Sequence, residues 1–218
     1  MIRISYEAHS PGAFLRPTST NKEDRNRIST AFMSMMKFHS DFDIPWCQSL
    51  LNSNISNVEI PTEHPLRTDR PPIHEGVSNS MFTQTLYTPF AIRAQMSFKR
   101  PTSEVDAIIP WESCYLLSLG SGIDGKSGRA HGGFNALILD QITGSVASMV
   151  SGSSAPATAT MTVDYKAPID TPSVVLCRGW AVERQGRKTW VKARIEDGQG
   201  KLLASGKALF VDPRPEKI

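Results

Sequence analysis

One apolar segment, His131–Val150 (HGGFNALILDQITGSVASMV), constrains the fold of this 218-residue chain more than any other feature. It is about five helical turns long, and apolar or small residues lie nearly all round it, which predicts a buried helix. Its single carboxylate, Asp140, is costly in such a helix unless it is paired or used in chemistry. The glycines after His131 let a ligand approach the backbone closely, and the free N–H groups of a helix start attract negative charge. These features favour a functional role for Asp140 over a purely structural one.

The segments around this helix predict an α+β fold. Strands are expected before it at Val105–Ile109 and Ser113–Leu119, and after it at 157–165, 173–184, 188–197 and 201–211. Gln185-Gly186 and Asp197-Gly198 are typical of hairpin turns between the last three strands. Residues 79–97 instead have apolar positions near helical spacing, with a kink or boundary at Pro89. One long central helix wrapped by a curled antiparallel sheet buries such a helix without a second helical layer.

The remaining chain is predicted to flank this domain. Residues 1–75 are expected to form an N-terminal arm and linker, partly irregular, because they begin polar and mixed in charge and carry four prolines at 61–75. A more ordered segment is expected to begin at Ile44 within this extension. Residues 76–212 form the predicted domain, and residues 213–218 form a C-terminal tail.

Composition limits the expected partners. Lys and Arg number 24 against 21 Asp and Glu, without a long basic block, so nucleic acid is not an expected partner. The central segment is interrupted by His131, Asp140 and Gln141, which predicts a core helix rather than a membrane span. The three cysteines lack paired spacing and indicate free thiols in a reducing compartment. We therefore expect a cytoplasmic protein without metal or cofactor, and mitochondrial targeting by the N-terminal arm stays open.

The loop before the helix matches two nucleotide-binding patterns. Gly120–Gly125 fits G-x-G-x-x-G, and Gly120–Ser127 fits the P-loop pattern G-x-x-x-x-G-K-[ST]. A P-loop helix would start at Lys126, where Gly128, Gly132 and Gly133 would each cost about 1 kcal/mol. Antiparallel strand signals follow, which leaves no room for parallel βαβ units, so nucleotide binding is not expected.

The spacing of the helix predicts a site shared between two chains. Asp140 follows His131 by nine residues, which puts it about 11–12 Å along the axis from a helix start at Gly132 or Gly133. One chain cannot readily present both to the same small reacting centre. Two antiparallel copies could, so a homodimer, or a dimer of dimers, is expected to polarise a carbonyl and activate water.

The pattern H-G-G-x-x-x-x-x-x-D, followed by T-A-x-x-x-x-x-Y-x-x-P, resembles the hotdog-fold thioesterases. The most similar branch is that of the PaaI-like and acyl-CoA thioesterase superfamily members of the 4-hydroxybenzoyl-CoA thioesterase superfamily. The resemblance covers about residues 81–212 and is strongest over 117–212. The matching residues include His131, Gly132, Gly133, Asp140, Gly144, Thr158, Ala159, Tyr165 and Pro168.

The resemblance implies roles for several residues. Asp140 would act as general base on water or as the attacking carboxylate, and the N–H of Gly133 in the other subunit would bind the thioester oxygen. Thr158 would orient the water or the carboxylate. His131 would bond the ligand or only hold the turn, and both readings stay open. The residues expected to contact substrate are Gly132, Asn135, Gln141, Gly144, Arg187 and Lys188.

Some of these assignments carry an alternative or depart from the family pattern. Arg187 and Lys188 could meet coenzyme A phosphates or could belong to a solvated turn. Gly125 stands where some branches carry a side-chain amide, and Gln141 stands where an acidic residue often follows the catalytic Asp. The first change removes one possible polariser of the carbonyl, and the second alters the pocket.

The expected activity is hydrolysis of an acyl thioester of coenzyme A or of an acyl carrier protein. One alternative is a hotdog enzyme that dehydrates or isomerises a carrier-bound acyl chain, possibly a polyketide, with Asp140 shuttling a proton. Another is a non-catalytic acyl-binding module. The identity of the acyl group does not follow from the sequence.

Overall fold

A single antiparallel sheet forms most of the ordered chain. The computed structural model describes residues 39–54, 62–63, 80–153 and 155–214. The seven strands have the order β1-β2-β3-β7-β8-β9-β6. Their bounds are Thr62–Glu63 (β1), Ile92–Pro101 (β2), Trp111–Leu119 (β3), Ala157–Tyr165 (β6), Ser173–Gln185 (β7), Lys188–Glu196 (β8) and Leu202–Val211 (β9). The strand β6 therefore forms one edge of the sheet, although it directly follows the central helix in sequence.

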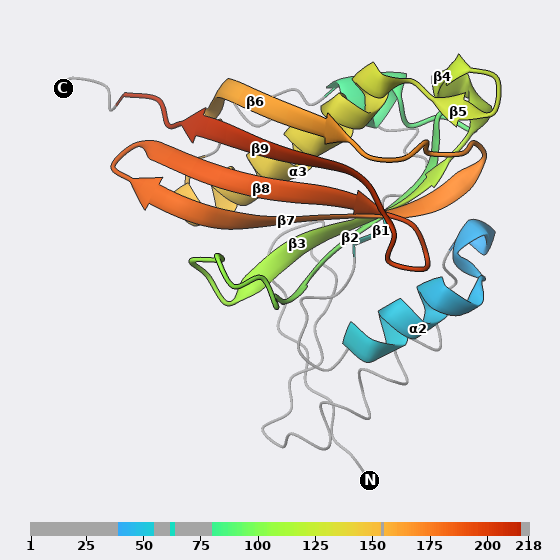
Figure 1. Cartoon of the computed structure of the whole chain (residues 1–218), viewed down its shortest axis with the longest axis horizontal. Coiled ribbons are helices and arrows are strands. Elements are labelled where there is room, and N and C mark those ends of the chain that lie inside the picture. The colour runs from blue at the N-terminus through green and yellow to red at the C-terminus, as the bar shows by residue number, and fades with distance from the viewer. Residues whose placement is uncertain (1–38, 55–61, 64–79, 154, 215–218) are drawn as a thin grey trace, which may run out of the picture.

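The central helix α3, Gly132–Ser151, lies along one face of the curled sheet (Figure 1). It packs mainly across β7, β8 and β9. Its side chains Phe134, Ile138, Leu139 and Ile142 form a core with apolar residues of the sheet, among them Leu117, Cys177, Ala193 and Ile195. The predicted α+β hotdog fold, with one long helix wrapped by an antiparallel sheet, is thus confirmed.

The prediction of helical structure over residues 79–97 is wrong for most of that range. Only η2, Met81–Thr85, is helical, and β2 begins at Ile92. Buried and half-buried residues alternate along β2, and every second side chain, Ile92, Ala94 and Met96, is buried. This period of two marks a strand, and pairing with β3 in register from Ala94 to Pro101 decides between the two interpretations.

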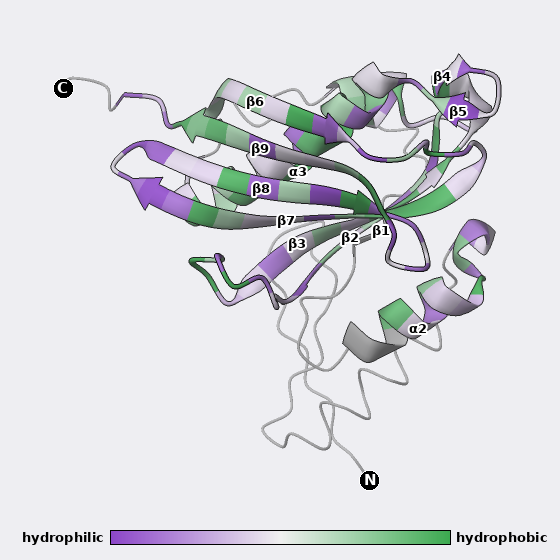
Figure 2. Ribbon diagram, viewed as in Figure 1, coloured by the Kyte–Doolittle hydropathy of each residue, from purple (hydrophilic) through white to green (hydrophobic). Residues whose placement is uncertain are grey.

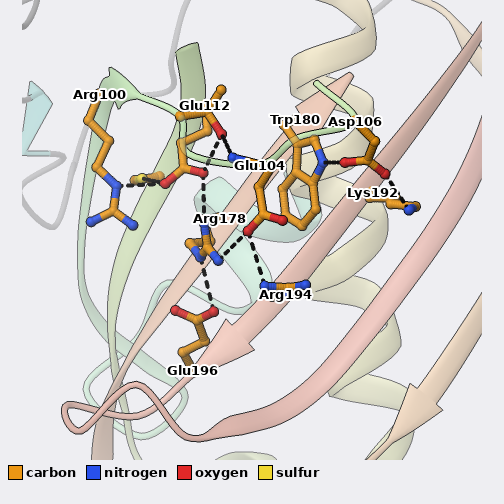
Figure 3. Close-up of polar contacts among 11 residues, drawn as sticks. Arg100, Glu104, Asp106, Glu112, Arg178, Trp180, Lys192, Arg194 and Glu196 are labelled. Atoms are coloured by element: carbon orange, nitrogen blue, oxygen red, sulfur yellow. Dashed lines mark hydrogen bonds and ion pairs between the residues drawn. The ribbon is translucent and has the colours of Figure 1, made fainter. Parts of the chain in front are cut away.

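The prediction of a strand at Val105–Ile109 is also wrong. These residues form a loop between β2 and β3, in which the Val105 side chain is fully exposed. The neighbouring acidic residues hold the loop to the sheet face opposite α3 (Figure 3). Asp106 accepts a 2.9 Å hydrogen bond from Trp180 Nε1 and another from Lys192 Nζ. Because Lys192 donates to it, the pKa of Asp106 lies below its usual value.

Arg178 is the centre of a buried charge cluster on this outer face (Figure 3). Its guanidinium donates to Glu104 at 2.6 Å, to Glu112 at 2.8 Å and to Glu196 at 3.0 Å. Arg100 donates to the other oxygen of Glu112 at 2.6 Å. Glu112 is only 1% exposed and Arg178 only 8%. Burial acts to lower the pKa of Arg178, but the charges of Glu112 and Glu196 outweigh it and raise that pKa above its usual value.

A helical segment ahead of the domain covers another part of the outer face, over β2, β3 and β7. It comprises η1 (Ser40–Phe42) and α2 (Pro45–Asn54), which lies on the side of the sheet away from α3 (Figure 1). Its buried residues Phe42, Cys47 and Leu51 pack against buried side chains of β2, β3 and β7, including Met96, Cys114, Leu116 and Leu176. Asp41 accepts from Ser118 Oγ at 2.6 Å, which ties the segment to β3. Most of residues 1–75 lies outside the described ranges, and the domain boundaries stay predictions.

Hydrophilic residues collect at two opposite ends of the molecule (Figure 2). One end is the β7–β8 hairpin, and the other is the short hairpin of β4 (Asp124–Lys126) and β5 (Arg129–Ala130) next to the helix start. No helix in the described part of the chain is long and apolar enough to cross a membrane. Among the same residues, no group of three or more His, Cys, Asp or Glu side chains is placed to hold a metal ion. Of the two hydrophilic ends, only the β4–β5 hairpin borders the start of α3.

Candidate active site

His131 caps the start of α3. Its backbone is extended, with φ −64° and ψ 139°, and its ring Nδ1 accepts a 2.9 Å hydrogen bond from the N–H of Gly133. The His131 N–H donates to Ile123 O at 2.8 Å, which fixes the turn against the segment before β4. A side-chain acceptor at the N-cap that satisfies a backbone N–H of the first turn stabilises a helix start. The sequence left two interpretations of His131, binding the ligand or holding the turn. The structure contains a contact for the second, holding the turn.

The peptide between Gly132 and Gly133 is held at both ends. Tyr165 OH donates to Gly132 O at 3.1 Å, and His131 binds the N–H of the same peptide. The N–H of Gly132 belongs to the preceding peptide and has no acceptor among the described residues. This differs from the expectation that Gly133 supplies the oxyanion donor, because the cap already uses that N–H. The donor left open at the helix start is Gly132.

Asp140 lies in the third turn of α3 beside the edge strand β6. Thr158 Oγ1 donates to Asp140 Oδ1 at 2.9 Å, so the structure brings these two predicted residues into contact. Asp140 is half-buried, as are Ala136, Leu137 and Gln141 on the same side of the helix. The expectation of a helix buried all round is therefore wrong for this side, because the sheet of one chain covers only the opposite side.

The two parts of the candidate site are well separated within one chain. With α3 starting at Gly132, the rise of 1.5 Å per residue places Asp140 about 12 Å along the axis from that residue. A carbonyl whose oxygen lies at a donor distance of about 2.7–3.1 Å from Gly132 is therefore out of reach of Asp140 in the same chain. The arrangement can activate water at one place and polarise a carbonyl at the other.

A half-open pocket of about 540 Å³ lies at the helix start. His131, Gly132 and Asn135 from α3 line one side, and the loop after Tyr165 lines the other with Ala167, Pro168 and Ile169. Lys126, Arg129 and Lys166 contribute three positive charges. Sequence reasoning considered Lys126 only as part of a P-loop, and gave no role to the other two cations or to Tyr165. The signals that could have indicated these residues were the Y-x-x-P pattern and the basic residues near the helix start.

The remaining predicted substrate residues are dispersed. Arg187 and Lys188 lie in the β7–β8 hairpin, at the opposite end of the molecule from β4 and β5 (Figure 1). Arg187 donates to the backbone oxygen of Asp212 at 2.8 Å, a contact within the fold. At Gly144, an added Cβ would stand 3.2 Å from the Phe210 ring, so close packing of helix on sheet accounts for this glycine.

Close packing also accounts for the glycines of the loop before α3. An added Cβ at Gly125 would stand 2.8 Å from the His131 ring, so the amide side chain of other branches has no room here. At Gly120 and Gly122 it would meet the backbone of Phe90 at 2.3 and 2.7 Å. Lys126 ends β4, and the next helix starts only at Gly132. The loop therefore lacks the strand-to-helix geometry of a P-loop, as expected from the sequence.

Comparisons with known proteins agree with this fold. Residues 127–204 match the family model described as the thioesterase superfamily, a segment that includes the helix start, Asp140 and Thr158. This match confirms the resemblance to the thioesterase superfamily seen in the sequence.

Two curated relatives are acyl-coenzyme A thioesterases. The chain is similar to THEM4 of Mus musculus, with 34% identity over 103 residues, 47% of this chain and 44% of the relative. It is also similar to THEM4 of Xenopus laevis, with 33% identity over 97 residues, 44% of this chain and 43% of the relative. The chain thus spans less than half the length of the relatives that it matches.

Solved structures are similar at lower identity. Thioesterase superfamily member 2 of zebrafish has a TM-score of 0.45 and 14% identity, covering 53% of this chain and 81% of that protein. The smu.793 protein of Streptococcus mutans, solved bound to acetyl CoA, has a TM-score of 0.44 and 18% identity, covering 49% and 84%.

Proposed function

We propose that this protein hydrolyses acyl thioesters of coenzyme A or of an acyl carrier protein, in a site shared by two subunits. The observation that carries the proposal is the carboxylate of Asp140, held by Thr158 at 2.9 Å on the central helix of a thioesterase-superfamily domain. The names of the curated relatives support coenzyme A as the carrier. An acyl carrier protein is included in the proposal because both carriers present the same phosphopantetheine thioester.

The reaction follows from the chemistry of the two site parts. Asp140 takes a proton from a water molecule, whose oxygen attacks the thioester carbon. The carbonyl oxygen becomes negative and accepts from the N–H of Gly132 of the partner subunit, with the helix start adding its positive end. When the tetrahedral intermediate collapses, the C–S bond breaks. The thiolate leaves with the proton that Asp140 accepted, and the acyl group leaves as a carboxylic acid.

Features of the single chain support a second subunit. The strand β6 is the last strand of the sheet, and nearly all of its side chains are exposed. Such an edge offers unpaired backbone groups to another strand. The adjacent side of α3, with Leu137 and Asp140, is only half-buried. A two-fold axis perpendicular to α3 on this side would make the two helices antiparallel and bring Asp140 of each chain to the Gly132 of the other, giving two equivalent sites.

The test is release of free thiol from matched substrates. The purified protein is incubated with a panel of acyl-CoA thioesters of increasing chain length and with the same acyl groups on phosphopantetheinyl carrier protein. We expect stoichiometric release of thiol and carboxylic acid from at least one series. An acyl group that changes without thiol release would contradict the proposal and indicate dehydration or isomerisation. Saturable binding with neither product would indicate an acyl-binding module.

A further inference from the structure

We propose that Asn135 recognises the carrier arm of the substrate by accepting a hydrogen bond from the amide N–H nearest the thioester sulfur. The inference rests on the proposed thioester hydrolysis and assigns a specificity-determining residue to that site. In phosphopantetheine thioesters this amide is joined to the sulfur by two methylene groups. It is therefore present whether the carrier is coenzyme A or a protein, and it is absent from simple alkyl thioesters.

The first observation is an unsatisfied polar group. Asn135 is only 5% exposed, and its Oδ1 is buried without a hydrogen-bond partner among the described residues. An amide oxygen in this condition has lost its hydration without a replacement, which is costly, and such groups in native proteins call for an explanation. Asn135 also lines the pocket at the helix start. A donor brought by a ligand in that pocket would satisfy the amide.

The second observation is where Asn135 stands relative to the open donor. It follows Gly132 by three residues on α3, and residues three apart lie on one helix face with about 5–6 Å between them. A thioester oxygen bound at the Gly132 N–H therefore places a group two methylenes beyond the sulfur near Asn135. The spacing of the Gly132 N–H and Asn135 thus fits the spacing of the thioester oxygen and the amide N–H in the substrate.

The third observation gives the direction of the arm. Lys126 and Arg129 have no charged partner among the described residues, and both contribute to the same pocket as Asn135. Lys166 joins them, paired loosely with Asp164 at 3.7 Å. Phosphate groups lie farther along the arm than the amide, so cations in this pocket suit an arm whose amide lies at Asn135. The acyl group then points away from the pocket, towards the side shared with the partner subunit.

The experiment measures selectivity for the amide. Wild-type protein and Asn135→Leu are assayed with a butyryl thioester of N-acetylcysteamine, which has the amide, and with a butyryl thioester of an alkyl thiol of the same length, which lacks it. One neutral hydrogen bond predicts a preference of wild type for the amide substrate of about tenfold in kcat/KM. In Asn135→Leu we expect this preference to fall to about one, through loss on the amide substrate.

A matched control separates recognition from stability. Thr189 is 1% exposed, and its Oγ1 is also buried without a partner, but it lies in β8 and does not line the pocket. Thr189→Val should keep the tenfold preference, and thermal unfolding should show both variants folded. If Asn135→Leu does not fold, Asn135→Ala provides the same comparison with a smaller side chain.

Three outcomes would overturn the inference. The first is a preference for the amide substrate that survives in a folded Asn135 variant. The second is that Asn135 confers a preference only for a 3-hydroxybutyryl thioester over a butyryl thioester of the same thiol. The hydrogen-bond donor that Asn135 recognises would then lie on the acyl group. The third is the absence of hydrolysis of any thioester by wild type, which would remove the proposed function together with the inference. Because this failure shows in wild type, it is distinguishable from the other two.

Discussion

Two polar regions of this protein lie on opposite sides of its sheet and differ in how completely their groups are paired. In the outer cluster, Glu112 is 1% exposed and accepts from Arg100, Thr102 and Arg178. At the start of α3, the Gly132 N–H and the Asn135 Oδ1 have no partner among the described residues. The cations Lys126 and Arg129 likewise have no charged partner there.

The difference separates structural from functional polarity. Buried charges that are fully hydrogen-bonded within one chain are explained by the fold, whereas unsatisfied groups around a pocket call for another explanation, which the proposal above gives as a bound ligand. Removing a group from the outer cluster should therefore cost stability and leave the chemistry intact. Removing a group from the site should do the reverse.

The largest effect is expected for Asp140→Asn. Removal of a general base lowers turnover by about 10²–10⁴-fold. Stability should be nearly unchanged, because the asparagine oxygen can still accept from Thr158. The measurement is kcat for thiol release together with thermal unfolding. Asp164→Asn is the matched control, since that carboxylate is 62% exposed and pairs only loosely with Lys166. Near wild-type turnover in Asp140→Asn would remove Asp140 from the mechanism.

Arg178→Ala should show the opposite pattern. It leaves Glu112, Glu104 and Glu196 without their shared partner, and breaking a buried ion pair in this way costs about 3–5 kcal/mol. Urea unfolding measures the loss, and kcat of the folded fraction should stay near the wild-type value. Lys201→Ala on the exposed β8–β9 turn should change stability by less than about 0.5 kcal/mol. A small loss of stability combined with a collapse of kcat would contradict the division between the two regions.

A smaller effect is expected for Tyr165→Phe. The variant removes the hydrogen bond to Gly132 O and leaves the ring in place, so one end of the Gly132–Gly133 peptide is released. The loss of one neutral hydrogen bond, about 0.5–1.5 kcal/mol, predicts a fall in kcat of roughly two- to tenfold with little change in KM. Tyr165→Leu, which also removes the ring from the pocket, should raise KM as well. A rise in KM without a fall in kcat for Tyr165→Phe would assign Tyr165 to substrate binding alone.

The smallest effect concerns pH and Asp106. Its pKa in the folded protein lies below the ordinary value of 3.8, mainly because Lys192 donates to it. The unfolded state therefore binds the proton more readily, and the stability that Asp106 contributes is present above pH 3.8 and lost as the pH falls through the folded pKa. Unfolding midpoints measured between about pH 2 and pH 5 should show a shallower acid decline for Asp106→Asn. An unchanged slope would show that Asp106 does not contribute.

The second half of the fold could be predicted closely from the sequence. The helix after His131 and the strands β6 to β9 carry strong periodicity and hairpin signals, and their observed bounds differ by at most one residue from those expected. The first half could not be predicted in this way. Apolar positions near helical spacing over residues 79–97 concealed the strand β2, and the apolar residues of Val105–Ile109 gave a loop the composition of a strand. Pairing with β3 makes the first segment a strand, and the contacts of Asp106 hold the second as a loop. Both are tertiary interactions, which a local sequence pattern does not contain.

The candidate site was predictable to a similar extent. The spacing of Asp140 from His131, and the T-A pattern at Thr158, indicated residues that the structure brings into contact or aligns on one helix. The resemblance assigned the oxyanion donor to Gly133, but the cap that His131 forms uses that N–H and leaves the N–H of Gly132 open. The cations of the pocket were missed because Lys126 and Arg129 lie in the β4–β5 hairpin, and Lys166 joins them only when the loop after β6 folds beside the helix start.

The central claim is that each active site combines Asp140 of one chain with Gly132 of the other. Gly132→Pro removes the open N–H at the first helical position, where proline is well tolerated. The extended backbone of His131 suits a following proline. An added Cβ at Gly132 meets the Tyr165 ring at an ordinary 3.5 Å. Gly132→Ala, which keeps the N–H, is the matched control and should stay active.

The most direct measurement is the activity of a purified heterodimer of Gly132→Pro and Asp140→Asn, separated by two affinity tags. Each homodimer should be nearly inactive. In the heterodimer one site collects both defects and the other collects neither, so the account predicts up to about half of the wild-type activity per dimer, by two-fold symmetry. A verified heterodimer as inactive as either parent would contradict the shared site.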